Sequence, residues 1–306
     1  MARALPAALR ERSALPLAFG TAPLATQFWG NDEATAVDAA VAAVRAGITW
    51  FDTAPLYGSG EAEERLGAAL RTAGDPPGLL VATKVGRPVV GIGDERTSTF
   101  DYSRAGTIVS LEASLARLGR DHVDIVHVHD PEDHLEQAID ECIPTLAELR
   151  DQGVIGAVSV GTMVCAAALR LLRESTLDAV MIANRLTLLD HTALDELVPE
   201  CADRGVPLIA AAVFNSGLLA SQRAGVWYDY APADDALVRR ARDADRVCER
   251  HGVSLRTAAL QYPLRFAPVR AVVAGMATAE QVHENLVSMS AAIPDEMWDE
   301  LDALNR

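Results

Sequence analysis

The chain has 306 residues, half of them hydrophobic, and its 43 acidic residues against 27 basic ones give a formal net charge of −16. We expect no nucleic-acid partner, because phosphate binding needs clustered basic residues. Neither an apolar leader nor a run of about 20 apolar residues is found, so we expect a cytoplasmic protein with no membrane partner.

Eight short apolar or β-branched runs follow one another along the chain. Most are continuous rather than alternating, which is typical of strands buried on both faces of a parallel sheet. The predicted strands are Leu17–Thr21, Ile48–Asp52, Leu79–Val85, Val123–His129, Val154–Val160, Ala179–Ala183, Val206–Ala212 and Ala271–Ala274.

Helical patterns with clear ends lie between several of these strands. The first, Glu33–Ala46, has Asn31 or Asp32 as its cap and Gly47 as its stop. The others are Glu61–Thr72, Leu135–Gln152, Asp235–Arg250 and Thr278–Ser288. Two long stretches, Gly86–Asp101 and Gly217–Pro232, are predicted to be irregular loops that carry function or are mobile.

Eight strand-then-helix units predict an α/β fold: a (β/α)8 TIM barrel formed by a single domain over residues 1–306. In such a barrel the active site lies at the C-terminal ends of the strands. The four cysteines, Cys142, Cys165, Cys201 and Cys248, are widely spaced, which favours reduced, buried thiols over a zinc site.

Polar residues end three consecutive predicted strands. They are Asp52, Lys84 and His129, and Tyr57 follows in the loop after Asp52. An ordinary tyrosine ionises near pH 10, but a neighbouring ammonium such as that of Lys84 favours the phenolate. Asp52 would balance Lys84, and His129 would orient a substrate oxygen. The set predicts proton transfer coupled to hydride transfer, and the hydride requires a cofactor because no side chain donates one.

Each of these residues taken alone is more often a cap, a packing residue or a surface charge, so the prediction depends on their joint placement. We expect His127 to face the opposite side of its strand from His129, as a buried histidine with its hydrogen bonds satisfied. With Asp130, the two histidines also suggest a metal-dependent hydrolase or lyase. No further ligand group stands at the neighbouring strand ends, so no metal is predicted.

Three segments carry a family resemblance: Phe51–Gly58 with Glu61, Ala82–Gly86, and Asp124–Pro131. The chain resembles the aldo-keto reductases from Leu17 to Asn285. The resemblance implies the same barrel, a nicotinamide cofactor, and a catalytic tetrad of Asp52, Tyr57, Lys84 and His129 with Tyr57 as the general acid/base.

Four further segments are similar to the sugar dehydrogenase branch of the family, which includes L-fucose, D-threo-aldose 1- and pyridoxal 4-dehydrogenases. They are His129–Glu132, Asn184–Asp190, Phe214–Ala220 and Trp227–Pro232. This implies oxidation of an aldose, such as L-fucose or D-arabinose, at C1 to the lactone, or the reverse reduction. The alternatives are a pyridoxal 4-dehydrogenase, a general aldehyde reductase and a non-catalytic module that senses nicotinamide.

The resemblance also implies binding residues. Those for the cofactor are Ser159, Asn184, Asn215, Ser216, Gly217, Leu219, Gly275, Gln281 and Asn285. The loops at the barrel mouth offer candidates for contact with a sugar or aldehyde substrate: Trp29, Trp227, Tyr228 and Tyr230. Packing of a loop on the barrel rim is the alternative for the last three.

Two departures from the family pattern concern the cofactor. The glutamine that many members have at the end of strand six is replaced by Ala183, followed by Asn184. Many members that use NADP carry a Lys-Ser pair and an arginine where this chain has Gly275, Met276 and Gln281. A 2′-phosphate would lose charged partners, so NAD is favoured over NADP. The oligomeric state stays open.

Overall fold

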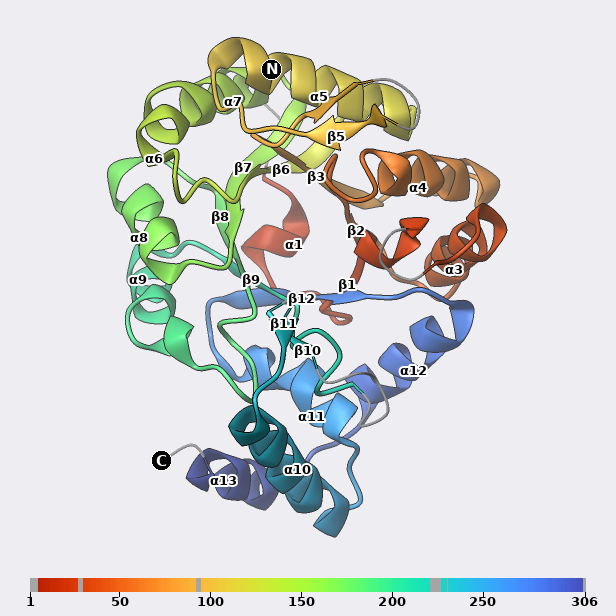
Figure 1. Ribbon diagram of the computed structural model, residues 1–306, viewed down its shortest axis with the longest axis vertical. Helices are drawn as coiled ribbons and strands as arrows, with labels where there is room; N and C mark the ends of the chain where they lie inside the picture. The colour runs from red at the N-terminus through yellow and green to blue at the C-terminus, as the bar shows by residue number, and fades with distance from the viewer. Residues whose placement is uncertain (1–4, 27–29, 92–94, 221–226, 230, 305–306) are drawn as a thin grey trace.

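Eight parallel strands close into a barrel, with helices around its outside (Figure 1). The structure is a computed structural model that describes residues 5–26, 30–91, 95–220, 227–229 and 231–304. Around the ring the strands run β1, β12, β9, β8, β7, β6, β3, β2. They are β1 (Leu17–Gly20), β2 (Trp50–Asp52), β3 (Leu80–Val85), β6 (Val123–His129), β7 (Ile155–Thr162), β8 (Ala179–Ala183), β9 (Leu208–Ala211) and β12 (Val269–Gly275). The predicted (β/α)8 barrel is confirmed.

The larger helices follow the strands along the chain and lie on the outside of the barrel. They are α3 (Glu33–Arg45), α4 (Glu61–Thr72), α5 (Arg104–Leu118), α7 (Ile143–Asp151), α8 (Cys165–Glu174), α9 (Leu197–Arg204), α10 (Asp235–Arg250), α11 (Leu255–Gln261), α12 (Ala279–Ser290) and α13 (Asp295–Ala303). The short ones are α1 (Ala7–Arg10), η1 (Ala22–Leu24), α6 (Leu135–Gln137), η3 (Ala138–Cys142), η4 (Thr192–Leu194) and η5 (Tyr262–Arg265). Among the described residues, no helix is both long and apolar enough to cross a membrane.

The predicted helix Leu135–Gln152 is interrupted by a π-helical segment. It consists of α6, then η3 with wider π-type turns, then α7. Pro144 lies in the first turn of α7 and has no backbone N–H to donate, so the regular hydrogen-bond ladder is incomplete at this junction.

The two stretches predicted to be irregular loops each contain a small hairpin. In the first, β4 (Val89–Val90) pairs with β5 (Thr97–Ser98). In the second, β10 (Trp227–Tyr228) pairs with β11 (Ala231–Pro232). Two-residue strands carry too little periodicity to be recognised in a sequence.

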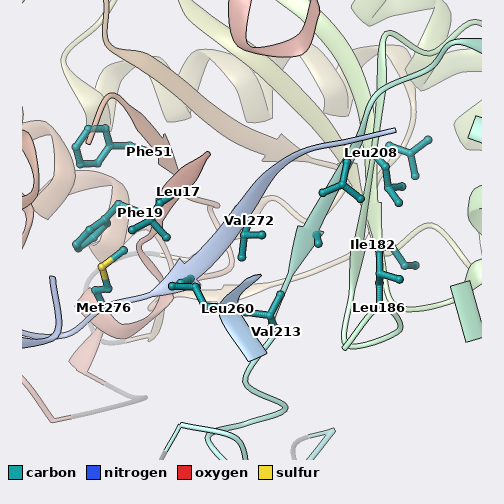
Figure 2. Packing of buried hydrophobic residues seen from close by; sticks show 14 of the residues in the cluster. Leu17, Phe19, Phe51, Ile182, Leu186, Leu208, Val213, Leu260, Val272 and Met276 are labelled. Atoms are coloured by element: carbon teal, nitrogen blue, oxygen red, sulfur yellow. The ribbon is translucent and has the colours of Figure 1, made fainter. Parts of the chain in front are cut away.

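The hydrophobic core has two parts. One lies between the strands and the surrounding helices, and Figure 2 shows a portion of it in which Phe19 of β1 lies beside Phe51 of β2. Their ring centroids are 5.7 Å apart. The other fills the barrel interior with residues such as Ala18, Trp50 and Ile125, and Leu9 of α1 packs into it. Since Ala18 and Trp50 stand early in their strands, α1 closes the N-terminal end of the barrel.

The interior core determines which residues reach the opposite end of the barrel. Side chains on a strand share a face at every second position. Trp50, Ala82 and Ala157 belong to the interior core. Two residues further along the same strands stand Asp52, Lys84 and Ser159, respectively. These polar residues therefore form a layer directly above the apolar filling. Asp52 and Lys84 stand at the C-terminal ends of their strands, whereas Ser159 lies within β7, which continues to Thr162.

Candidate active site

The loop that carries Tyr57 connects β2 to α4 through a tight run of turns. Gly58, Ser59 and Gly60 all have positive φ angles, of 63°, 52° and 97°. A Cβ at Gly58 would lie 2.7 Å from that of Ala25, and one at Gly60 would lie 2.7 Å from Cδ of Arg117. Glycine is therefore needed at both positions, and the loop lies close against its neighbours.

Asp52 and Lys84 form a buried ion pair in the barrel mouth. The ammonium of Lys84 donates to Oδ2 of Asp52 at 2.7 Å and to the carbonyl oxygen of Thr53 at 2.8 Å. Burial lowers the pKa of Lys84, but the charge of Asp52 and then that of Tyr57 outweigh it, so the net pKa lies above its ordinary value. Burial raises the pKa of Asp52, and the Lys84 ammonium opposes that shift. A protonated lysine is thereby held inside the barrel.

Tyr57 and His129 face each other beside this pair. The Lys84 nitrogen lies 5.0 Å from the centroid of the Tyr57 ring. The rings of Tyr57 and His129 meet edge to face, with centroids 6.2 Å apart. Burial, followed by the charges of Lys84 and Arg87, holds the pKa of His129 well below its usual range, so its ring is neutral at pH 7. The structure therefore brings all four predicted tetrad residues together.

His127 corrects one expectation, because it faces the barrel interior and not the opposite side of its strand. Residues two apart on a strand share a face, so His127 lies on the same side as His129. Its Nε2 is 3.5 Å from Oδ1 of Asp52. Burial and the Lys84 charge lower its pKa well below the ordinary value. His127 is thus a neighbour of the ion pair that the sequence reasoning missed, although its period-two spacing from His129 was a sufficient signal.

Several of the residues predicted to hold the cofactor belong to three neighbouring strands or to the loops that follow them. Ser159 is in β7, Asn184 follows β8, and Asn215 to Leu219 follow β9. Asn184 and Asn215 are buried with positive φ, and Nδ2 of Asn215 lies 3.5 Å from the carbonyl oxygen of Asn184. Oδ1 of each is buried, and no described residue donates a hydrogen bond to it. These two open acceptors fit the amide of a nicotinamide ring, which brings two N–H donors.

The other predicted cofactor residues lie beside β12 and α12. Gly275 is the exposed last residue of β12. Oε1 of Gln281 accepts from the backbone N–H of Ala277 at 2.7 Å, and Thr278 caps α12 by accepting from the backbone N–H of Gln281. Buried Asn285, one turn further on, completes this part of the rim.

Arg256 of α11 is a basic group at this end that the sequence reasoning did not identify. Its guanidinium lies 3.4 Å from Oδ1 of Asn285 and 3.4 Å from the carbonyl oxygen of Ala220. It also forms an ion pair of 2.9 Å with Glu284. Helix α11 was not predicted, so no pattern pointed to this arginine. Its charge is already balanced by Glu284.

The predicted substrate residues fall into two groups. Trp29 and Tyr230 lie outside the described residues. Trp227 is exposed on β10, and Tyr228 donates its hydroxyl to Oδ2 of Asp190 at 2.9 Å. The Tyr228 hydroxyl is thereby engaged with the loop after β8, and the described contacts do not bring either residue to the tetrad.

Glu61 holds the loop after β1 against the start of α4. Its two carboxylate oxygens accept from the backbone N–H of Thr26 at 2.7 Å and from the hydroxyl of Thr26 at 2.6 Å. Arg65 pairs with the same carboxylate at 2.6 Å and donates to the carbonyl oxygen of Leu24. The loop that leads to Trp29 is therefore tied to the loop that carries Tyr57.

The strand ends of this barrel bring together a charged lysine, a carboxylate, a phenol and a neutral histidine. This is the layout of an enzyme that moves a proton at a substrate oxygen. Among the described residues, no group of three potential metal ligands occurs. The model of the aldo/keto reductase family matches residues 16–306. The chain belongs to this family and is an NAD(P)-dependent oxidoreductase.

Individual relatives support this assignment. The chain is 38% identical to a D-threo-aldose 1-dehydrogenase of a Pseudomonas species, covering 97% of this chain and 96% of that one. It is 33% identical to a pyridoxal 4-dehydrogenase of Microbacterium luteolum, covering 92% and 91%. A solved aldo-keto reductase of Bacillus halodurans, in its holo form, superposes with a TM-score of 0.79 at 27% identity over 99% of this chain and 95% of that one.

Proposed function

We propose that the protein oxidises an aldose, such as L-fucose or D-arabinose, at C1 to the lactone, with Tyr57 as the general acid/base and NAD as the preferred cofactor. The observation that carries this proposal is the 2.7 Å pair of Lys84 and Asp52 beneath the Tyr57 ring. A buried ammonium next to a phenol stabilises the phenolate, which is the form that can accept a proton.

Tyr57 acts as the base in the oxidative direction. Its phenolate accepts the proton of the C1 hydroxyl, and the same phenol returns a proton to the carbonyl oxygen in the reverse reaction. His129 is neutral, so one ring nitrogen can donate a hydrogen bond to that oxygen and fix its direction. A nicotinamide held by Asn184, Asn215 and Ser159 would accept the hydride from C1.

The preference for NAD follows from the charges at the far end of the rim. The described groups near Asn285 offer one guanidinium, that of Arg256, and Glu284 already neutralises it. A 2′-phosphate would have to compete with this carboxylate, whereas a ribose hydroxyl would not.

The similarity to a pyridoxal 4-dehydrogenase supports a second candidate substrate, the aldehyde of pyridoxal or its alcohol form. The same tetrad chemistry serves either substrate, because both reactions move a proton at one oxygen and a hydride at its carbon. An activity screen that includes aldoses, simple aldehydes and pyridoxal separates the two.

The Tyr57→Phe variant tests the proton-transfer role. We expect its turnover to fall by roughly 10²–10⁴-fold or more, because the acid/base is lost, while binding of NADH stays nearly unchanged. Steady-state rates and quenching of tryptophan fluorescence by NADH measure the two effects. Tyr262→Phe is the matched control, since this buried ring stacks on His191 away from the tetrad. Full activity of Tyr57→Phe would refute the assignment.

A further inference from the structure

Arg87 and Asp130 form an ion pair at the rim that the proton-transfer chemistry does not use. Asp130 directly follows His129 at the end of β6, and Arg87 follows β3 two residues after Val85. Nη1 of Arg87 lies 2.6 Å from Oδ2 of Asp130. The two side chains are 23% and 29% exposed, so the pair lines the mouth of the barrel and is not buried beneath it.

The carboxylate of Asp130 lies directly beside the reacting centre. Its Oδ2 is 3.6 Å from Nε2 of His129, the histidine that faces Tyr57. Since His129 is neutral, this contact is not an ion pair. An oxygen bound at His129 and a second oxygen bound at Asp130 would therefore be close neighbours, as the oxygens on adjacent carbons of a sugar are.

The backbone of Asp130 is held in an uncommon conformation. Its φ of 47° lies in the left-handed region, which non-glycine residues adopt at a cost. Its backbone N–H donates to the carbonyl oxygen of Gly161 at 3.0 Å, and the Tyr102 hydroxyl donates to its carbonyl oxygen at 2.8 Å. A partly exposed ion pair adds little stability, so stability alone does not explain why a carboxylate is held there.

Each member of the pair has a polar atom that forms no hydrogen bond with the described residues. Contacts to Arg87 and His129 both go to Oδ2 of Asp130, and no described residue donates to its Oδ1. Nε of Arg87 is buried, and no described residue accepts its hydrogen. The guanidinium plane rests over the Phe100 ring, with its central carbon 4.9 Å from the ring centroid, which fixes its direction.

We propose that Asp130, held by Arg87, binds the hydroxyl on the carbon next to the reacting one, so that the enzyme selects α-hydroxy aldehydes and aldoses. The proposal rests on the proposed function, because it takes the reacting oxygen to lie at His129 and Tyr57. The substrate hydroxyl donates to Oδ1 of Asp130, which no described residue engages. Such charge-assisted bonds discriminate strongly against a substrate that lacks the hydroxyl.

D-Arabinose and 2-deoxy-D-ribose test the proposal, because they differ only in the C2 hydroxyl. The native full-length enzyme and its Asp130→Asn variant are each assayed with both sugars. Asparagine tolerates the left-handed backbone, so the variant removes the charge and one acceptor oxygen without straining the chain. We expect the native enzyme to favour D-arabinose in kcat/KM by roughly 10- to 100-fold, and Asp130→Asn to lose most of that preference while its rate on 2-deoxy-D-ribose changes by less than about threefold.

Asp75→Asn is the matched control. Asp75 also has a positive φ, of 43°, and pairs with Arg120 at 2.8 Å, but it lies between α4 and β3 at the opposite end of the barrel. We expect the Asp75→Asn variant to keep the native kcat/KM for both sugars. An equal loss on both sugars in Asp130→Asn would mean that Asp130 only positions His129 and would overturn the proposal. Native turnover of simple aldehydes but of neither sugar would also overturn it, whereas no turnover of any substrate would instead refute the proposed function.

Discussion

The chemistry of single residues in the barrel mouth depends on one buried positive charge. Lys84 is 2% exposed, and its ammonium is compensated by Asp52 and the carbonyl oxygen of Thr53. Removing one partner of such a pair leaves an uncompensated charge, which is far more costly than the pair itself. Burial lowers the pKa of His127 and of His129 most, and the charge of Lys84 adds to that shift, so both rings stay neutral beside the ion pair.

The two neutral histidines predict how stability depends on pH. Their pKa values in the folded protein lie well below 6.5, the ordinary value that applies to the unfolded chain. Below about pH 6.5 the unfolded chain binds protons that the native protein does not. We therefore expect the free energy of unfolding to fall as the pH drops from 6.5 to 5, by up to about 1.4 kcal/mol per pH unit for each histidine. Urea titrations at several pH values measure this slope.

A His127→Gln variant isolates one of these contributions. It removes a titrating group that faces Asp52 and Lys84, so its slope below pH 6.5 should be smaller than that of the native chain. His283→Gln, on the exposed side of α12, is the comparison that should keep the native slope. Equal slopes in the native chain and His127→Gln would show that His127 is not held neutral.

At the scale of helices and strands, the sequence predicts the elements that have a clear hydrophobic period or a clear capping residue. Asp235–Arg250 is observed with the predicted bounds, and Asp32 caps α3 as expected. The predicted strand Val206–Ala212 is observed as Leu208–Ala211, and it ends before Ala212 because that residue has a φ of 53° and leaves the extended conformation. Helices α5 and α8 were not predicted. Helix α5 has local end signals, because Ser103 caps it and Gly119 ends it in the left-handed conformation, whereas α8 begins after Val164 without a side-chain cap.

The residues of the candidate site likewise divide into those that a local pattern predicts and those that only the folded structure brings into place. Asp52, Lys84 and His129 could be placed from strand ends, because the position of a strand end fixes where its last side chain lies. Arg256 could not, because its role depends on a contact between α11 and the loop after β9. Such contacts between distant segments have no local sequence signature.

Helix α4, which follows the loop that carries Tyr57, makes a close contact with α5, and Gly67 permits it. A Cβ at this position would lie 2.6 Å from the carbonyl oxygen of Leu118. Alanine is favoured over glycine in a helix by about 1 kcal/mol, but overpacking costs roughly 1–3 kcal/mol. We expect Gly67→Ala to lower the free energy of unfolding, measured by urea denaturation. A more stable variant would show that α4 and α5 can separate freely.

At the scale of the whole molecule, the ring of strands closes between β1 and β12, so the first and last strands depend on each other. We propose that residues 1–306 form one domain for this reason. Closure also brings Asp52 from β2, Lys84 from β3 and His129 from β6 to one rim. The proposed cofactor would lie along Arg256 and α12.

Two linked measurements test the proposed activity most directly. The protein is titrated with NADH and with NADPH, and the rates of L-fucose and D-arabinose oxidation are then measured with NAD and with NADP. Quenching of tryptophan fluorescence gives the two affinities. We expect NADH to bind more tightly by about tenfold, because Glu284 already pairs with Arg256, and we expect aldose-dependent reduction of NAD. Stronger binding of NADPH would contradict the cofactor preference, and cofactor binding without turnover of any aldose, aldehyde or pyridoxal would contradict the catalytic role.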